Sequence, residues 1–303
     1  MIRFVIALMP MCLWSVFGSG QDSIPTTVST PKDTTWFFTG INTLNFSQVA
    51  LKNWSGGGQS AISGTALISH KLTYRKGKTL WESQLNLAYG VQQADKIGTR
   101  KTDDRIELIT TYGKEAFGKW YYTSSAQFRS QFSPGYNYPN DSVVISNFLA
   151  PGYVQVMVGL ENKIRDCFLV FVAPLTAKYT IVNDRALSAY GAFGVDPGKR
   201  FRQEYGGSVR TQYSCPIMEN VQLSAQLDLF SNYVRKPFNI DVNGQAILSC
   251  KVNKYISTSI AANLIYDDDI KITEDKDADG VPELIGPRTQ FKEVFNLGIQ
   301  YSL

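Results

Sequence analysis

From Trp36 to the end of the chain, apolar and polar residues alternate with a period of two, in segments of ten or more residues. This period is typical of a β-strand whose two faces meet different surroundings. The segment 221–229 shows it clearly: apolar side chains occupy the odd positions from Val221 to Leu229, and polar side chains occupy the even positions from Gln222 to Asp228. The pattern therefore predicts an all-β chain built of strands with one apolar and one polar face.

The length of these segments separates a soluble sandwich from a membrane barrel. Sandwich strands average about five or six residues, whereas a tilted strand needs roughly 9–11 residues to cross a bilayer. The alternating segments reach that length, and we expect twelve of them: 36–48, 59–73, 79–91, 101–115, 119–133, 151–163, 168–181, 201–215, 219–232, 238–251, 254–267 and 289–303. The predicted fold is a closed antiparallel transmembrane β-barrel of about 12 strands.

The connections between these strands alternate in length. We expect short turns at 76–78, 117–118, 164–167, 216–218 and 252–253, and longer loops at 49–58, 92–100, 134–150, 182–200, 233–237 and 268–288, although 233–237 blurs the distinction. Outer-membrane barrels have short periplasmic turns and longer external loops, and an even strand number places both termini in the periplasm. Trp36, Trp81 and Trp120 begin strands, where an aromatic belt would lie at the periplasmic interface or where rings would cap a core.

The two ends of the chain predict export and insertion. Residues 1–20 read as a signal peptide, because Arg3 precedes an apolar run that is too short for an anchor helix. Residues 21–35 read as a flexible lead, and 36–303 as the barrel domain. The last segment, 296–303, resembles the assembly signal of outer-membrane barrels, with Leu303 in the final position. We therefore expect the outer membrane of a Gram-negative cell as the location, and outer-membrane lipids and the barrel assembly machinery as partners.

Charge and cysteine content exclude some classes of protein. The formal net charge of +4 falls to +3 without Arg3, which is small for a nucleic-acid binder. Without the signal peptide three cysteines remain, Cys167, Cys215 and Cys250, which cannot all pair within one chain and are too few for a disulfide scaffold. Their redox state is left open.

Seven short segments together resemble one protein family. They are 46–58 (FSQVALKNWSGGG), 104–109 (DRIELI), 138–141 (YPND), 150–153 (APGY), 174–176 (PLT), 229–233 (LFSNY) and 287–293 (PRTQFKE). The family comprises Bacteroidetes envelope proteins with a domain of unknown function. The resemblance implies an outer-membrane β-barrel over nearly the whole mature chain, and it brings no activity, substrate or catalytic residue.

The polar phase of the strands predicts which side chains line the lumen. It places inside Glu82, Gln84, Arg129, Glu161, Lys178, Glu204, Arg210, Asp228 and Asp241. Such residues could line a water-filled channel for small solutes or oligosaccharides. They could equally pair across a narrow lumen and seal it, which would leave a structural or surface-interaction barrel. The mixture of both signs argues against a strongly ion-selective filter.

An enzyme is the third and least favoured reading. His70 is the single histidine, so a serine hydrolase would have to use it. Outer-membrane phospholipases of twelve strands carry histidine and serine two residues apart on the lipid face of one strand, but here that position is Leu72. A neighbouring strand would have to supply the nucleophile, and we name no catalytic residue.

The last external loop carries a candidate calcium site. Carboxylates alternate before a glycine and a further glutamate follows, so that the predicted ligands are Asp275, Asp277, Asp279, the carbonyl of Val281 and Glu283. The twelfth position is Gly286 rather than a bidentate glutamate, and Asp267 to Asp269 could add ligands. The alternative is an acidic loop that is merely solvated.

Overall fold

A computed structural model describes residues 35–50, 60–94, 98–136, 142–165, 167–253, 255–268, 272–274, 283–286 and 288–302. The predicted signal peptide, nearly all of the predicted lead and four of the five proposed calcium ligands lie outside these residues. Within them no helix is long and apolar enough to cross a membrane.

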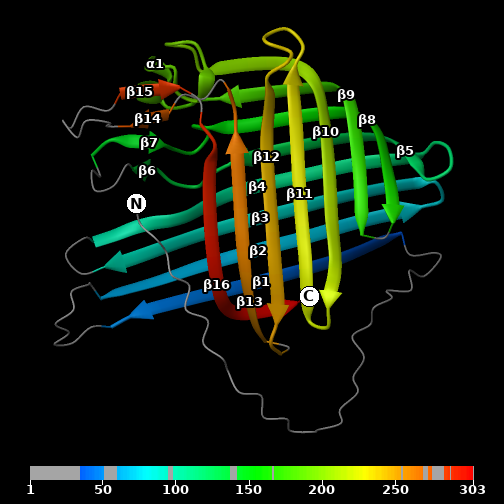
Figure 1. Cartoon of the computed structure of the whole chain (residues 1–303), viewed down its shortest axis with the longest axis horizontal. Helices are drawn as coiled ribbons and strands as arrows, with labels where there is room; N and C mark the ends of the chain where they lie inside the picture. The colour runs from blue at the N-terminus through cyan, green and yellow to red at the C-terminus, as the bar shows by residue number, and fades with distance from the viewer. Residues whose placement is uncertain are drawn as a thin grey trace, which may run out of the picture. The chain divides into compact units, whose positions relative to one another are not determined.

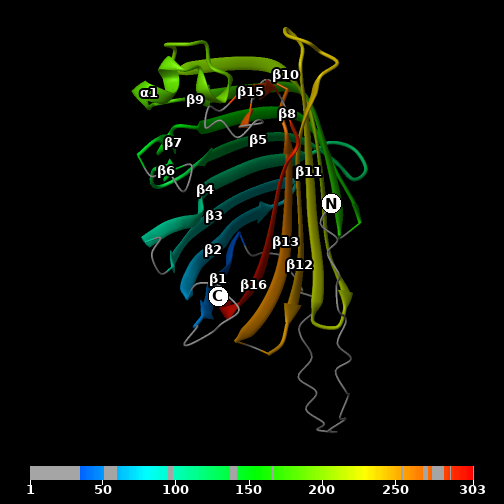
Figure 2. The ribbon, with the colours of Figure 1, turned by 60° about the vertical axis from the view of Figure 1, so that its left-hand side comes forward.

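Twelve antiparallel strands close into one barrel (Figures 1 and 2). Their bounds are β1 Trp36–Val49, β2 Ala61–Lys76, β3 Thr79–Ala94, β4 Gly98–Glu115, β5 Trp120–Ser130, β8 Gly152–Arg165, β9 Phe168–Ile181, β10 Phe201–Met218, β11 Val221–Asn232, β12 Ile240–Lys251, β13 Ile256–Tyr266 and β16 Gln290–Ser302. Each barrel strand pairs with its neighbours in the chain, and β16 closes the ring on β1. The predicted fold and the strand number are confirmed.

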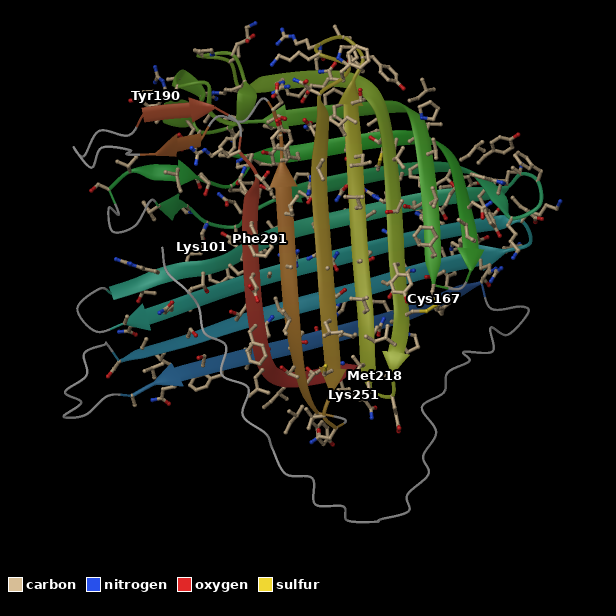
Figure 3. All side chains as sticks on the ribbon, in the orientation of Figure 1. Lys101, Cys167, Tyr190, Met218, Lys251 and Phe291 are labelled. Carbon is tan, nitrogen blue, oxygen red and sulfur yellow. A yellow bond between two sulfur atoms is a disulfide. The ribbon has the colours of Figure 1, made fainter. Side chains whose placement is uncertain are left out.

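Short turns gather at one end of the barrel, which we call the short-turn end. They join β2 to β3, β4 to β5, β8 to β9, β10 to β11 and β12 to β13. The first residue of β1, Trp36, pairs with Tyr74 just before one of these turns, so the chain also enters the barrel here. Figure 3 places Met218 and Lys251 toward this end, and Tyr190 at the opposite one. The opposite end is the long-loop end.

Two predicted connections differ from the structure. The turn expected at 216–218 is part of β10, whose pairing with β11 shifts between Pro216 and Met218, so that the reversal falls at 219–220. The long loop expected at 92–100 shortens to 95–97, because β3 and β4 extend past the predicted strand ends. Both errors came from turn-forming residues that the structure accommodates inside or at the ends of strands.

A bulge in β9 sets which side chains face inward. The register of β9 against β10 shifts opposite Gly206–Ser208, where β9 contains Pro174, a residue that cannot donate to a ladder. The Thr176 hydroxyl donates to the carbonyl of Ala173 at 3.1 Å within this bulge. Phe171 and Ala173 before the bulge, and Thr176 after it, are all buried. The shift therefore keeps Lys178 on the inner face.

The loops at the long-loop end contain short elements of their own. These are β6 Gly135–Tyr136, β7 Val144–Ser146, helix α1 Arg185–Ala189, the 3-10 turn Ala192–Gly194, β14 Ile272–Glu274 and β15 Glu283–Gly286. Ala150, Val182, Leu187 and Val195 form a small buried apolar cluster between two of these loops. The loops at this end thus have a packed core of their own.

A disulfide joins two strands near the short-turn end. Cys167 follows β8 and bonds to Cys215 of β10, with the two Cα atoms 5.2 Å apart, while Cys250 is free. The sequence left this pairing open, because strand-to-strand proximity cannot be read from cysteine spacing.

Candidate functional site in the barrel lumen

Side-chain contacts between strands that are not neighbours identify the inner face of the barrel. On the outside of a closed ring, side chains reach only neighbouring strands, so a contact between strands two or more places apart passes through the interior. Gln155 of β8 donates to Ser208 of β10 at 3.2 Å, across β9. Lys163 of β8 lies 3.7 Å from Glu82 of β3, across β5 and β4. These side chains therefore project into the lumen.

A hydrogen-bonded chain of polar side chains, which we call the lumen chain, runs through the interior from β2 to β11. Its bonds are Ser69 to Asn86 at 2.8 Å, Asn86 to Glu107 at 3.0 Å, Gln127 to Glu107 at 2.8 Å, Arg210 to Gln127 at 2.8 Å, Arg210 to Asp228, Gln226 to Asp228 at 2.7 Å and Gln212 to Gln226 at 2.9 Å. The step from Arg210 to Gln127 passes from β10 to β5 over two intervening strands. The lumen chain thus crosses the interior as well as following its wall.

The two intervening strands, β8 and β9, carry apolar inner side chains beneath this crossing. Met157, Phe171 and Ala173 form a buried cluster, with Leu169 packed against it. Arg210 and Gln127 are each only 4% exposed. Because a charged guanidinium is buried only where it is paired and hydrogen-bonded, Asp228 and Gln127 are what hold Arg210 in place.

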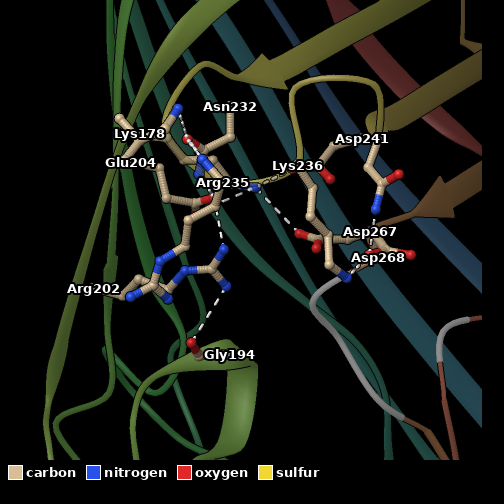
Figure 4. Close-up of polar contacts among 12 residues, drawn as sticks. Lys178, Gly194, Arg202, Glu204, Asn232, Arg235, Lys236, Asp241, Asp267 and Asp268 are labelled. Carbon is tan, nitrogen blue, oxygen red and sulfur yellow. Dashed lines mark hydrogen bonds and ion pairs between the residues drawn. The ribbon is translucent and has the colours of Figure 1, made fainter.

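A second group of charges lies nearer the long-loop end, and we call it the Lys178 cluster (Figure 4). The Lys178 Nζ atom lies 2.6 Å from Asp241, 3.1 Å from Asp267 and 3.8 Å from Glu204. Lys178 is on β9, whereas Asp241 lies near the start of β12 and Asp267 follows β13, so these ion pairs join strands that are three and four places apart in the barrel. They hold these parts of the wall together.

Further contacts complete the Lys178 cluster. Arg202 donates to Glu204 at 2.7 Å and to the carbonyl of Gly194 at 3.3 Å, which ties the loop 182–200 to the barrel wall. Asn232 donates to Glu204 at 3.1 Å. The ring of Phe230 lies beneath Lys178, with the ammonium 5.2 Å from its centroid. The ion pairs of the Lys178 cluster therefore lie over an aromatic ring.

A third group, the Glu82 cluster, lies toward the short-turn end. Glu82 is 2.6 Å from Lys71, on the neighbouring strand, and 3.7 Å from Lys163 on β8, three places away in the barrel. The side chains of Lys71 and Lys163 are 43% and 38% exposed, against 15% for Lys178. Inward-facing Ser69, Ser214 and Gln222 are exposed as well. These inward-facing side chains toward the short-turn end are therefore more exposed than Lys178.

The residues predicted to line the lumen take part in these groups. Lys178, Glu204 and Asp241 belong to the Lys178 cluster, Arg210 and Asp228 to the lumen chain, and Glu82 to the Glu82 cluster. Glu161 is buried. Arg129 lies over the ring of Tyr153, 5.8 Å from its centroid. Gln84 donates to Asn86 at 3.1 Å. The sequence predicted that these residues face inward, and the structure adds which of them contact one another.

Sequence reasoning placed Gln84 inside but missed the amides Gln127 and Asn86 and the role of one aspartate. Gln127 and Asn86 lie in the inward phase of their strands, and this phase was the available signal. They were not predicted because the prediction concentrated on charged side chains. Asp267 and Asp268, considered as extra calcium ligands, instead bind lysines: Asp267 pairs with Lys178, and Asp268 lies 2.7 Å from Lys236. The lysines occupy the positions that a cation would take.

A small cavity remains between the lumen chain and the Lys178 cluster. It has a volume of about 20 Å³ and is lined by Gln127, Arg129, Tyr153, Gln155 and Lys178. A cavity of roughly 10–15 Å³ or more by this measure holds one water molecule. This space can hydrate the surrounding charges, and it is too small for a sugar.

His70 and the calcium loop lie apart from this site. His70 shares the outer face of β2 with the exposed Leu72, donates through Nε2 to the Asn42 amide oxygen at 3.1 Å and meets Phe38 edge-on at 5.2 Å. Asp275, Asp277, Asp279 and Val281 lie outside the described residues. The backbone of Glu283 is described, and it pairs with Glu274 in the β14–β15 hairpin.

Comparison with known proteins gives a family match and several distant likenesses. The family model described as "Protein of unknown function (DUF3078)" matches residues 46–136. This agrees, over that part of the chain, with the resemblance to a domain of unknown function. No curated protein matches the chain.

The structural likenesses are to barrels of low sequence identity. The translocator domain of autotransporter NalP from Neisseria meningitidis is 10% identical with a TM-score of 0.38, and the match covers 88% of each chain. An outer membrane channel from Pseudomonas putida F1 is 10% identical with a TM-score of 0.40, covering 88% of this chain and 94% of that one. The NanC porin is 10% identical with a TM-score of 0.38, covering 88% and 100%. At these scores the likenesses carry no conclusion about activity.

Proposed function

We propose that this chain is an outer-membrane β-barrel whose lumen is closed toward the external medium by its own side chains. It acts as a structural or surface-interaction barrel rather than as a permanently open pore. The observation that carries this proposal is the pair of crossings from Arg210 to Gln127 and from Lys178 to Asp241. Both join strands that are not neighbours; Lys178 lies toward the long-loop end of β9 and Arg210 at the middle of β10.

The outer face supports placement in a membrane. At the short-turn end, Trp36, Tyr74, Trp81 and Tyr112 follow one another in register across four strands, with the rings of Trp36 and Tyr74 4.8 Å apart. Near the long-loop end a second aromatic group contains Tyr179, Phe201 and Tyr205. Two aromatic girdles that flank an apolar band are typical of outer-membrane barrels.

The spacing of the girdles suits a bilayer. Tyr89, on the outer face of β3 and edge-on to Phe132, is a further aromatic residue toward the long-loop end. Tyr89 is eight residue steps along β3 from Trp81, which at about 3.3 Å per step and a tilt of roughly 40° gives about 20 Å of height, near the apolar band of about 25 Å. In this proposal the short-turn end is periplasmic and the long loops are external, in a Gram-negative envelope protein of the Bacteroidetes type. Membrane lipids and the barrel assembly machinery are the expected partners.

The external loops are the part available for interaction. The side chains of Tyr190 and Phe238 are 86% and 97% exposed on ordered loops. Exposed aromatic rings on a rigid support are typical of binding surfaces. The calcium site at 275–283 stays a prediction of the sequence and would add a further contact at this end.

A gated channel for small solutes or oligosaccharides is the second candidate. It is favoured by the exposed inward-facing side chains of Ser69, Lys71 and Gln222, which make a polar vestibule below the closure. In that case the Lys178 cluster and the lumen chain would form the gate.

Single-channel recording in a planar bilayer tests the proposal. We expect the unmodified barrel to show no steady open level, because the crossings block the axial path. A Lys178→Ala, Arg210→Ala double variant removes both crossings and should produce discrete openings, whereas Lys199→Ala, which affects only an exposed pair on loop 182–200, should not. A steady porin-like conductance of the unmodified protein would refute the closure.

A further inference from the structure

The barrel closes through an unusually short seam between β1 and β16. Five residue pairs join the two strands, from Ile41 with Ser302 to Asn45 with Gly298. By comparison, β1 makes fourteen pairs with β2, and β16 makes ten with β13. The two strands meet near the C-terminal end of β16 and run apart beyond it (Figures 1 and 2).

The pairing stops although both strands continue toward the long-loop end. Continued in the same register, the pairing would place Phe46–Val49 opposite Val294–Leu297. No ladder pair joins these two segments in the described part of the chain, although each pairs on its other edge with β2 or β13. Every second backbone group of the two segments therefore faces the gap rather than a strand.

Asn45 and Gly298 form the last residue pair between β1 and β16 before the strands separate. The Asn45 side-chain amide donates to the Asn296 side-chain oxygen at 3.1 Å. A Cβ atom on Gly298 would lie 2.0 Å from the Asn45 amide oxygen, so that glycine is required for the Asn45 side chain to lie across β16. These contacts hold β1 and β16 together at the point where the strands separate.

Apolar side chains lead from the gap into the lumen. Val294, Ala261 and Ile247 occupy one row across β16, β13 and β12 on the inner face, and none of the three is fully buried. On the other side of the gap, the inner face of β1 carries Ser47 and Val49, which pair with Ser63 and Ala61 of β2. The row becomes polar only at the next strand, where Ser224 pairs with Ile247.

The outer face beside the gap is also apolar. Phe46 is 60% exposed, and Phe295 and Leu297 are 69% and 56% exposed. Apolar side chains thus flank the gap on the outer face, and Val294 lies beside it on the inner face between Asn296 and Lys292, whose ammonium is 3.1 Å from Asp103.

We propose that the upper β1–β16 seam is a lateral portal that admits the acyl chain of an amphiphile from the outer leaflet into the lumen. The apolar row holds the chain, and the unpaired backbone groups of Phe46–Val49 and Val294–Leu297 bond the polar part of the molecule. Lipid is as apolar as the row, so burial of the chain supplies little preference. Hydrogen bonds to the unpaired backbone groups supply the preference for binding, since such groups are costly when they stay unpaired at membrane depth. This portal goes beyond the proposed function, because it opens sideways rather than along the closed axis.

Quenching by lipid tests the portal directly. In a Cys250→Ser background, a bimane label is placed on Val294→Cys inside the gap, and the folded protein is inserted into phosphatidylcholine vesicles with brominated acyl chains. Ile260→Cys on the outer face is the positive control, and Ser224→Cys, in the same inner row as Val294 but three strands from it, is the matched negative control. The heat-dependent gel shift verifies that each variant is folded.

We expect quenching at position 294 to match that at 260 and to exceed that at 224 several-fold. Equal quenching at 294 and 224 would overturn the portal, whatever the conductance of the barrel. Cross-linking of two chains through position 294 would overturn it too, since a second copy would then cover the gap.

Amide exchange in the unmodified protein gives an independent readout. Of the four amides at 294–297, the two that face β13 should be protected and the two that face the gap should exchange freely. Equal protection of all four would show that the seam is zipped to its end, which excludes the portal.

Discussion

Arg210 on β10 donates through Nη2 to the side-chain oxygen of Gln127 on β5 at 2.8 Å, although β9 and β8 lie between these strands in the barrel wall. The same guanidinium pairs with Asp228 on the neighbouring β11. The Arg210 side chain thus connects the part of the lumen chain on β2 to β5 with the part on β10 and β11. This contact across the barrel interior therefore depends on a residue that alternation alone marks only as polar and inward.

Removal of this side chain should destabilise the barrel. Arg210→Ala leaves the Asp228 carboxylate and the Gln127 amide without their shared partner in a site where the Arg210 side chain is only 5% exposed. Breaking a buried ion pair from one side costs about 3–5 kcal/mol. Urea unfolding of the protein in vesicles measures the change in the free energy of unfolding.

Two further variants separate a buried pair from ordinary loss of charge. Arg210→Met with Asp228→Leu removes both partners and should be closer to neutral than Arg210→Ala. Lys199→Ala removes an exposed pair, whose side chains are 69% and 58% exposed, and should change stability by less than about 1 kcal/mol. If Arg210→Ala behaves like Lys199→Ala, the lumen chain does not hold the walls together.

Arginine on the outer face should prevent insertion, whereas arginine in the vestibule should be tolerated. Leu227 lies on the outer face of β11, and Gln222 lies on the inner face of the same strand toward the short-turn end. An arginine near the bilayer midplane costs about 2–4 kcal/mol. Leu227→Arg should therefore reduce the folded fraction in a vesicle insertion assay and Gln222→Arg should not; the reverse order would invert the assignment of the two faces.

The end of the chain should matter more than its beginning. Tyr301 and Ser302 supply two of the five pairs that close β16 on β1. Deletion of 301–303 should thus impair membrane insertion much more than deletion of 21–30, which precedes the first strand. Insertion of the two truncated proteins into outer-membrane vesicles is compared by the heat-dependent gel shift. Equal yields would contradict the role of the seam.

The loop helix α1 should loosen in acid. Asp184 caps it by accepting from the amides of Leu187 and Ala186 at 3.1 and 3.0 Å, and the Leu187 bond above all lowers the pKa of Asp184 below its ordinary value of 3.8. A lowered carboxyl pKa contributes stability that is present above the ordinary value and is lost as pH falls through the lower one. Protection of the Leu187 amide against exchange should therefore fall below about pH 4.

Asparagine at position 184 separates capping from titration. Asp184→Asn keeps a good cap but cannot titrate, so its protection at neutral pH should be near that of the parent and independent of acid. Asp184→Ala should lose about 1 kcal/mol at neutral pH. An unchanged acid response in Asp184→Asn would show that another group is responsible.

The strands could be predicted from the sequence because each carries its own signal. Alternation from Val221 to Leu229 fixes both the length and the two faces of β11, whatever the neighbouring strands do. Local irregularities were harder to predict. The bulge at Pro174 and the continuation of β10 through Pro216 depend on how the partner strand accommodates a missing donor.

The site could be predicted only as a set of inward positions. Which inward side chains meet depends on the circumference and tilt of the barrel, and these are properties of all twelve strands together. Nothing near Lys178 in the sequence indicates that Asp241 and Asp267 lie beside it. The short seam is a similar case, because the alternation of β1 and β16 continues past the point where their pairing ends.

The central claim is that the lumen is closed on the external side and accessible from the periplasm, and labelling from each side tests it most directly. In a Cys250→Ser background, Ser69→Cys places a thiol in the vestibule, and Phe238→Cys places one on an external loop. With a membrane-impermeant maleimide, intact cells should label position 238 but not 69, and permeabilised outer membranes should label both. Labelling of position 69 in intact cells at the rate of position 238 would contradict the account.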